Sequence, residues 1–583
     1  MNTLIIKLFN KAIQTQNSVS FKEMNEVAMK SGYIVHPDLC SDDVFQWLKS
    51  QQININTTFY KQWNDIISKN RFELYVDQIT HYASTYGTNY TGDAYILNDG
   101  ADVPDYSSFK VISLITKEEV ILRCEKMLFS NVALKQETIS DVLSILTALN
   151  HKVNIDLVRN KEAKMILYKE TDQLPKEASE MVRYLVYLAT GKSLLIKDVM
   201  SIESIKTSGI DVSLLIQKFG LKELSSVFYR YKPLLLAFKT NKSNIICINK
   251  LRRLAKSNHV PLVKGYFESL LSTPSSVHEL QDKLLTLSNY KKIGLLQTIL
   301  IRKKELANRA FVVRNQKLFI KEEKLKANKD YFDLLYTTIY YSLIHSVKSK
   351  ACKIKLPIGV NLTLPVSEKS FIGNYPLGTS FDFSDSDNII GIHWRGVDGA
   401  QDLDLKLIDI DGNQYGWNAN YYNSNASIVF SGDMTSAHPE ATELMYTTKG
   451  FKPAIVKCNL YNGESNSKFK FFIAKEKIVK LERNYMVNPN NIVISVDCEM
   501  DSEEKCLGVI TENKFVLAQF RTGRGRVAGD SVTNQYTEYA LHTLGCYLSL
   551  ADVLQDAGFK ITNESPDIDL TNLSKDSLLS LFS

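Results

Sequence analysis

The sequence predicts an α+β protein of several domains, in which an α-helical N-terminal region precedes an antiparallel β domain and a short helical tail. Three observations predict this fold class. The chain has 583 residues, more than one hydrophobic core usually organises. Segments with helical periodicity dominate residues 1–330, whereas short β-rich segments separated by turn signals dominate residues 350–532. Helical spacing returns after residue 532.

We expect five segments along the chain. Residues 1–110 are expected to form a helical subdomain, and residues 111–330 a basic helical region for which a helical-repeat architecture is one alternative. Residues 331–350 predict an aromatic connecting helix, residues 351–532 the β domain and residues 533–583 the helical tail. The helical region shows no fixed period, so its sequence does not establish a solenoid.

Local signals mark individual helices in the N-terminal region. Apolar residues at helical spacing in EASEMVRYLVYLATG predict a helix that ends at Gly191, a residue type that favours the left-handed C-cap. Thr138 is the expected N-cap of TISDVLSILTAL. Ser276 and Glu279 have the spacing of a capping box. These signals support a mainly helical first half.

Strand signals replace helical ones after about residue 350. The segments ASIVF, KPAIVKCNLY, KFKFFIAK, NIVISVDC and KFVLAQF are rich in β-branched and aromatic residues and are separated by turns. Asp411-Gly412 predicts a hairpin turn, because glycine adopts the positive φ that tight hairpins require. An antiparallel arrangement follows from these short connections.

Composition and cysteine usage indicate an ordinary soluble protein. Hydrophobic residues make up 44% and charged residues 23% of the chain, and the formal net charge is +6. The eight cysteines are scattered without a CxxC pair, which is typical of free thiols in a reducing compartment. The N-terminus lacks the apolar run of a secretion signal, and no segment has the length of a membrane span. We therefore expect a cytoplasmic protein without membrane insertion.

The segment QDLDLKLIDIDGNQ at 401–414 carries the clearest chemical signal. An EF-hand loop is excluded, because with Asp409 as position 1 the required glycine of position 6 arrives at position 4. Asp402 and Asp404 are two residues apart and therefore lie on the same side of a strand. Their carboxylates repel unless water solvates them or a cation bridges them. A solvated sheet face and a cation site both remain open.

Four motifs follow one another between His393 and Glu443: Gly399-Ala400-Gln401-Asp402-Leu403-Asp404-Leu405, then Asp409-Ile410-Asp411-Gly412, then Asn418 to Asn423, then Ser431-Gly432-Asp433. With these motifs in this order, the region resembles the TerD family, the tellurium-resistance and general stress proteins of bacteria. The resemblance covers about a third of the chain. With the helical region and LPVSEKS at 364–370, the whole chain also resembles a larger bacterial family that ends in a TerD-like domain.

The resemblance implies a calcium-binding β-sandwich and a matching set of ligands. Asp402, Asp404 and Asp433 match the family's pattern, and Glu440 or Glu443 is a less certain match. Two departures stand out: Phe430 replaces the histidine that usually precedes Ser-Gly-Asp, and the loop after Asp433 has fewer carboxylates. Calcium affinity follows ligand charge, so we expect weak calcium binding. The other interpretation is that these residues bind no cation and only hold loops in place through hydrogen bonds.

The second signal is a run of basic residues without acidic ones between Arg230 and Lys264. Cations interleaved with aromatic residues can neutralise phosphates and stack on bases, as in nucleic-acid grooves. Solvated faces of successive helices, pointing in unrelated directions, are the alternative. The candidate residues for RNA or DNA binding are Arg230, Lys232, Lys250, Arg252, Arg253 and Lys256.

Two functional hypotheses follow. No GxSxG, HExxH, Walker A or kinase signature occurs in the sequence, which offers no positive sign of an enzyme. The first hypothesis is a non-enzymatic cytosolic protein that binds calcium through a TerD-like domain and protein partners through its helical region. The resemblance implies a bacterial or phage-related role in stress responses or defence against tellurite, oxidants or phage. The second hypothesis is a nucleic-acid-binding helical-repeat protein with an accessory β domain.

Overall fold

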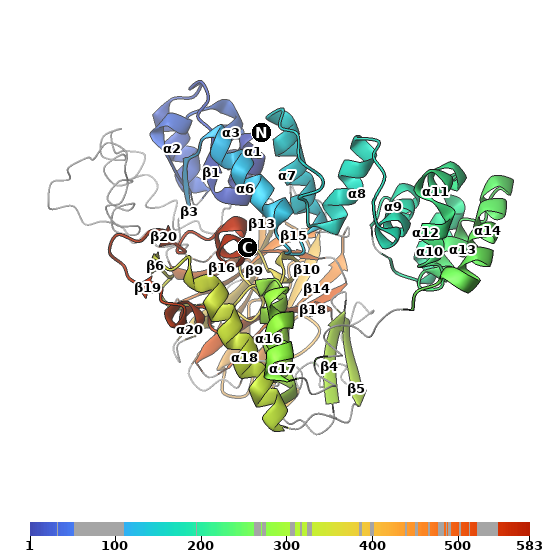
Figure 1. Ribbon diagram of the computed structural model, residues 1–583. Coiled ribbons are helices and arrows are strands. Elements are labelled where there is room, and N and C mark those ends of the chain that lie inside the picture. Colours follow the sequence, from blue (N-terminus) through green and yellow to red (C-terminus); the bar gives the residue numbers. More distant parts are fainter. Residues whose placement is uncertain are drawn as a thin grey trace. The chain divides into compact units, whose positions relative to one another are not determined.

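The computed structural model of the chain consists of two compact units. Unit 1 comprises Met1–Val120 together with Ser275–Ser583, and unit 2 comprises Ile121–Pro274. This division differs from the boundaries expected near residues 110 and 330. The structure describes residues 1–31, 33–51, 110–193, 195–261, 270, 276–303, 309–314, 317–322, 329–383, 387–396, 401–437, 440–448, 453–463, 467–475, 483–485, 487, 491–500, 503–511, 513–521 and 546–583. Figure 1 shows the elements that these residues form.

Unit 1 begins with a small parallel sheet in place of a purely helical subdomain. Its strands are β1 (Lys11–Ala12), β2 (Tyr33–Val35) and β3 (Lys110–Leu114), in the order β1-β3-β2. The helices α1 (Asn2–Phe9), α2 (Phe21–Lys30) and α3 (Asp42–Ser50) share a hydrophobic core with this sheet. The expectation of an all-helical segment 1–110 was wrong at these positions, because strands of two to five residues are too short to show alternation.

Two mainly antiparallel sheets form the β region of unit 1. The nine-stranded sheet runs β11-β10-β14-β17-β18-β5-β4, with β8 also paired to β18 and β7 to β8. The five-stranded sheet runs β12-β13-β9-β15-β16. The strands are β4 (Arg309–Arg314), β5 (Lys317–Glu322), β7 (Val360–Asn361), β8 (Ser380–Asp382), β9 (Asn388–Arg395), β10 (Asp402–Asp409), β11 (Gln414–Tyr415), β12 (Ile428–Phe430), β13 (Glu440–Thr447), β14 (Ala454–Asn462), β15 (Ser467–Ala474), β16 (Ile492–Met500), β17 (Glu504–Ile510) and β18 (Lys514–Arg521).

Side chains of both sheets contribute to one hydrophobic cluster. Leu403, Leu405 and Leu407 of β10 alternate into it from the nine-stranded sheet. Ile390 and Ile392 of β9 enter it from the five-stranded sheet. Burial of these apolar side chains is the main term that stabilises the two sheets against each other. The alternation of LDLKL predicts a strand with one apolar face, and β10 confirms this prediction.

The predicted hairpin at Asp411-Gly412 is confirmed between β10 and β11. Gly412 has φ 85°, in the left-handed region that glycine adopts without strain. The Asp409 carboxylate accepts hydrogen bonds from the backbone N–H groups of Asp411 at 3.0 Å and Asn413 at 2.9 Å. The Asp409 carboxylate is thus occupied in holding the turn, which is a structural role.

Helices and a hairpin complete unit 1. A β hairpin, β4–β5, lies in the region 111–330 that we expected to be helical. Its sequence basis is two short apolar segments rich in β-branched and aromatic residues, RAFVVR and KLFIKE. The tail, also expected to be helical, adds β19 and β20 on either side of β6 in a parallel sheet. The remaining elements are α16 (Val277–Leu285), α17 (Asn289–Lys303), α18 (Lys329–Lys348), β6 (Lys353–Lys355), α20 (Leu550–Asp556), β19 (Lys560–Ile561), β20 (Ile568–Asp569) and α21 (Lys575–Phe582).

Unit 2 is helical. After α6 (Lys117–Phe129), which begins in unit 1, its helices are α7 (Gln136–Ala148), α8 (Lys161–Glu170), α9 (Ala178–Thr190), α10 (Val199–Thr207), α11 (Ser213–Phe219), α12 (Leu221–Ser225), α13 (Lys232–Ala237) and α14 (Lys242–Asn258). Burial recurs every ten residues from α12 to α14. The three sets of equivalent buried positions are Leu224, Leu234 and Asn244; Val227, Ala237 and Cys247; and Phe228, Phe238 and Ile248. The ten-residue period of burial is not apparent in the sequence, because the residue types vary within each set.

The helix signals have mixed outcomes. Gly191 caps α9 with φ 68°, as predicted. Ser276 caps α16 and accepts the Glu279 N–H at 3.2 Å, as predicted. Thr138 is not an N-cap: Lys135 holds that position in α7, and Thr138 is buried inside the helix. Within the described residues, none of the helices combines the length and apolar character that a membrane crossing requires.

The packing of β9 yields a first prediction. A Cβ atom at Gly391 would approach Phe472 Cζ to 2.3 Å and Leu444 Cδ2 to 2.7 Å, and both side chains are fully buried. Gly391→Ala is therefore expected to destabilise unit 1 by about 1–3 kcal/mol through overpacking. Denaturant unfolding measures this change. Ser495→Ala, at an exposed position of the same sheet, is the control and is expected to change stability by less than about 0.5 kcal/mol. Equal stabilities of the two variants would contradict this packing.

Candidate cation site

Strand β10 places two carboxylates side by side at its beginning. Leu403 and Leu405 face the shared core, so the alternation of the strand turns Asp402 and Asp404 away from it. The ladder with β14 shifts register between Asp402 and Leu403, and such an irregularity re-aims the side chain at the strand end. Asp404 is only 3% exposed, so a solvated sheet face does not describe its environment.

A third carboxylate reaches this position from the segment that follows β12. Ser431 is tied to β13 twice: its N–H donates to the Leu444 carbonyl at 2.9 Å, and its Oγ accepts the Leu444 N–H at 3.0 Å. Gly432 has φ 110°, a backbone conformation that L residues rarely adopt. The chain thereby turns at Ser431-Gly432 and brings Asp433 to the start of β10. One carboxylate oxygen each from Asp402, Asp404 and Asp433 lie within 4.8 Å of one another.

Glu443 of β13 connects the two segments that carry these aspartates. Its Oε2 accepts the backbone N–H of Leu405 at 2.7 Å, and its Oε1 accepts the backbone N–H of Met434 at 2.9 Å. Leu405 directly follows Asp404, and Met434 directly follows Asp433. The buried Glu443 carboxylate therefore fixes the distance between the two aspartates. Each oxygen of the carboxyl group accepts one backbone N–H group, which suits this bridging role.

Burial, with a smaller contribution from neighbouring charges, raises the pKa values of Asp402, Asp404 and Glu443. Burial raises the pKa of Asp404 to about 7; the charges of Asp402 and Asp433 add to this, while hydrogen bonds from Asn459 and Trp417 oppose it. Burial and the Asp433 charge raise the pKa of Asp402 to about 6. Burial also raises the pKa of Glu443 well above its ordinary value, against the two backbone hydrogen bonds that it accepts. The ionised cluster is therefore strained by desolvation and repulsion.

This donor set could hold a metal ion. The site offers three carboxylate oxygens, the ligand type that hard cations such as Ca²⁺ and Mg²⁺ prefer. Asp402 Oδ1 is buried and makes no hydrogen bond among the described residues. A buried carboxylate oxygen without a donor is costly, and a cation supplies the missing positive partner. Asn459 Nδ2 donates to Asp404 Oδ2 at 3.1 Å and orients that carboxylate from the neighbouring strand.

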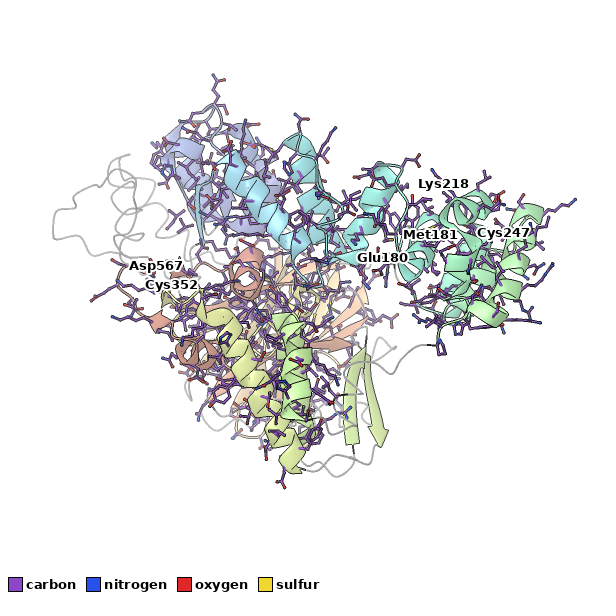
Figure 2. All side chains as sticks on the ribbon, in the orientation of Figure 1. Glu180, Met181, Lys218, Cys247, Cys352 and Asp567 are labelled. Atoms are coloured by element: carbon purple, nitrogen blue, oxygen red, sulfur yellow. The ribbon has the colours of Figure 1, made fainter. Side chains whose placement is uncertain are left out.

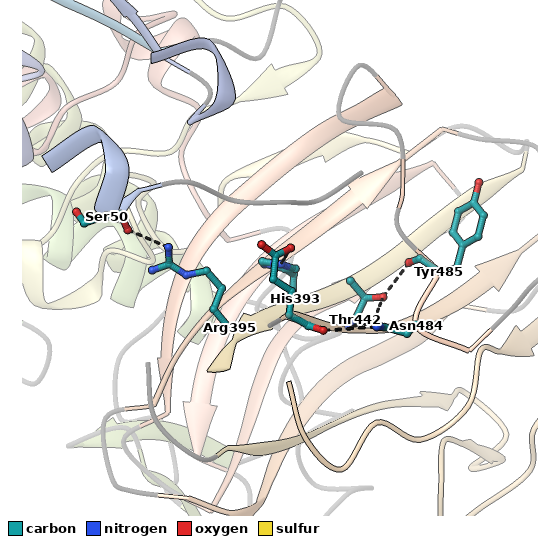
Figure 3. A network of polar contacts seen from close by, with 7 residues as sticks. Ser50, His393, Arg395, Thr442, Asn484 and Tyr485 are labelled. Carbon is teal, nitrogen blue, oxygen red and sulfur yellow. Dashed lines mark hydrogen bonds and ion pairs between the residues drawn. The ribbon is translucent and has the colours of Figure 1, made fainter. Parts of the chain in front are cut away.

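Glu440, the remaining sequence candidate, has a different partner. Its Oε2 lies 3.3 Å from His393 Nε2 across the β9–β13 ladder, and both residues are buried. Burial lowers the pKa of His393, so the pair is a hydrogen bond to a neutral imidazole at neutral pH. Figure 3 shows His393 within a polar network that also contains Thr442 and Asn484; Asn484 Oδ1 accepts the Thr442 N–H at 2.9 Å. The structure thus places Glu440 in a sheet network and outside the aspartate cluster.

The basic candidates belong to unit 2. Lys250, Arg252, Arg253 and Lys256 lie on α14 and are exposed. Lys232 begins α13, and Arg230 precedes it with its guanidinium bound to the backbone carbonyls of Val260 and Pro261. Four of the six predicted residues thus share one helix.

Some residues of the site were not predictable from the motif. The sequence suggested Glu443 as a ligand, whereas the structure shows its two oxygens engaged by backbone donors. Asn459 and Trp417 carry no local signal, because their relation to Asp404 arises from strand pairing and from a loop. Asp404 lies opposite Asn459 in the ladder between β10 and β14. This pairing cannot be predicted without knowing the order of the strands in the sheet.

Comparisons with known proteins do not extend the sequence resemblance. No protein-family model, no curated protein and no solved structure matches the chain. The likeness to TerD proteins therefore rests on the ordered motifs from Gly399 to Asp433.

The raised pKa values predict an unusual pH dependence of stability. A carboxyl group whose pKa is higher in the folded than in the unfolded chain stabilises the fold below its unfolded pKa of about 4, and this stabilisation is lost as the pH rises through the folded pKa. Unit 1 without added cation should therefore lose stability between about pH 4 and pH 7. Asp404→Asn should flatten this dependence and stabilise the cation-free protein at pH 8 by about 2 kcal/mol. Denaturant unfolding in the presence of a chelator over this pH range measures both effects. If Asp404→Asn were less stable than the wild type at pH 8, the ionised carboxylates would not destabilise the cation-free protein as proposed.

Proposed function

We propose that residues 351–532 form a TerD-like β-sandwich that binds a divalent cation through Asp402, Asp404 and Asp433. The observation that carries the proposal is the convergence of three carboxylate oxygens within 4.8 Å, from strand β10 and from a segment some thirty residues downstream. Three anionic groups at this separation repel one another unless protons or a cation neutralise them. Because Glu443 nevertheless holds the segments of Asp404 and Asp433 together, cation binding explains why the fold keeps these carboxylates close.

Calcium is the cation that we assign to this site. Calcium accepts about 6–8 oxygen ligands in flexible geometry, including bidentate carboxylates, backbone carbonyls and water. Three aspartates supply part of such a shell and leave room for water. Magnesium demands near-ideal octahedral geometry and keeps most of its water, so it makes less use of clustered carboxylates. The three-carboxylate set carries little charge for a calcium site, which supports a weak affinity rather than a storage role.

The role that we propose for the protein is non-enzymatic. The cation would join the start of β10 to the Ser431–Met434 segment and so hold that edge of the β-sandwich in one conformation. The helical unit would serve as the interaction surface for partners. The resemblance to TerD proteins supports a function in stress responses or defence against tellurite, oxidants or phage.

Calcium titration of the full chain tests the proposal. Calcium should give a saturable binding heat and raise the melting temperature of unit 1, by an amount equivalent to about 2.7 kcal/mol at a calcium concentration of 100 Kd. Asp402→Asn combined with Asp404→Asn should abolish both effects. Magnesium at equal concentration should stabilise less. Absence of calcium-dependent heat and stabilisation in the wild type would contradict the proposal.

Two further variants separate ligands from supporting residues. Asp382→Asn removes an exposed carboxylate of the same nine-stranded sheet and should leave calcium binding unchanged. Glu443→Gln keeps the shape of the clamp but replaces one acceptor oxygen with a donor. It should weaken calcium binding by about 10–100-fold, as is usual when a group that orients metal ligands is changed. Equal loss in the Asp382 variant would assign the binding to general surface charge.

A further inference from the structure

Helix α14 divides its side chains between a packed side and a strongly basic side. The packed side consists of Asn244, Cys247, Ile248, Leu251 and Ala255, all buried. The opposite side follows the line Lys242, Ile246, Asn249, Arg253 and Lys256, whose spacings of four and three residues keep them on one face of a helix. Figure 2 draws the side chains of this unit and labels Cys247, one of the buried residues of α14. We call the second side the basic face; it also includes Lys250 and Arg252.

Both ends of α14 are fixed to the rest of unit 2. At the first turn, the buried Asn244 accepts the Val212 N–H at 3.0 Å and donates to the Ile210 carbonyl at 2.9 Å. At the last turn, Asn258 Nδ2 donates to Ser225 Oγ at 3.2 Å, and the Val260 N–H donates to the Ser226 carbonyl at 2.9 Å. The basic face is therefore presented on a rigid element.

Two cations from outside the helix add to the basic face. Lys239 Nζ donates to Asn249 Oδ1 at 2.6 Å, which places an ammonium group in the middle of the line. The Arg230 guanidinium bonds the carbonyls of Val260 and Pro261 just beyond the end of the helix. The sequence from Leu224 to Pro261 contains no Asp or Glu. The Asp211 carboxylate lies beside Ser243 at the first turn, about 15 Å along the axis from Arg253.

From these observations we infer that the basic face of α14 binds single-stranded nucleic acid. This interaction is independent of the proposed cation site. Cations spaced over about 21 Å of helix match a polymer that carries a negative charge at every unit. Tyr229, 41% exposed and edge-on to His259 at 4.9 Å between centroids, offers a ring beside Arg230 on which a base can stack.

The packing of α14 disfavours an anionic membrane as the partner. A helix that lies in a membrane surface inserts its apolar face into the lipid. In α14 that face, with Ile248 and Leu251, is buried within unit 2. What remains exposed is the basic face, on which two isoleucines, Ile245 and Ile246, also lie exposed. A phosphate backbone needs no apolar insertion, so it fits this surface better.

Fluorescence anisotropy with the full chain tests this inference, with labelled 30-nucleotide oligo-uridine and oligo-thymidine as probes. The wild type should bind at least one of them, with an affinity that falls steeply with salt. Arg253→Gln combined with Lys256→Gln should weaken binding at least tenfold and reduce the slope of log K against log salt by about 1.4, since each lost phosphate contact removes about 0.7 on single strands. Tyr229→Ala should weaken binding about fivefold or more.

The control is Lys161→Gln combined with Lys169→Gln, which neutralises two exposed lysines of α8 in the same unit. It should bind like the wild type, and circular dichroism should show that all variants are folded. No binding at 50 mM salt, or equal losses in the α14 and α8 variants, would overturn the inference. Tighter binding to duplex DNA, to phosphatidylserine vesicles or to polyglutamate than to both single strands would overturn it in favour of that partner.

Discussion

The site at the start of β10 depends on one buried carboxylate, that of Glu443. Its two oxygens accept the backbone N–H groups that follow Asp404 and Asp433, so a single side chain of β13 sets the separation of two aspartates from different segments. Both donors are backbone groups next to the aspartates, and the geometry is therefore insensitive to the rotamers of the aspartates themselves. Loss of this clamp would leave the buried N–H group of Leu405 and the partly buried N–H group of Met434 without this acceptor, at a cost of about 1–3 kcal/mol for the buried one.

By holding the two segments together, Glu443 also keeps several carboxylates close to one another in a partly buried place, where their negative charges repel. Asp402, Asp404, Asp433 and Glu443 share a partly desolvated volume, and burial raises the pKa of three of them. A structure that needed only hydrogen-bonded loops could use Asn or Ser at these positions without repulsion. Three aspartate oxygens within 4.8 Å of one another are instead an arrangement that a divalent cation stabilises.

Much of this arrangement could be predicted from the sequence, for identifiable reasons. The alternation in LDLKL and the Asp411-Gly412 turn are local signals, and they located β10, its core face and its hairpin. The convergence of Asp433 with Asp402 and Asp404 was suggested only by the order of motifs, because it depends on the β12–β13 turn and on Glu443. Short strands such as β1 and β19, and the ten-residue burial period of α12 to α14, gave no signal, since their pattern exists only in packing. The sequence shows the basic residues of α14 as a run without acidic residues. That they lie on one side of a helix follows only from the bounds of α14 and its buried residues.

Proton release on calcium addition tests the central claim, that these carboxylates are held together for a cation. With pKa values of about 6 for Asp402 and about 7 for Asp404, part of the cluster carries protons near pH 6.5. A cation that binds there must displace them. In a pH-stat at pH 6.5, calcium should release on the order of one proton per calcium bound from the wild type, and much less from Asp404→Asn, in which only Asp402 still holds part of a proton. Calcium binding without proton release, or equal release from that variant, would contradict the account.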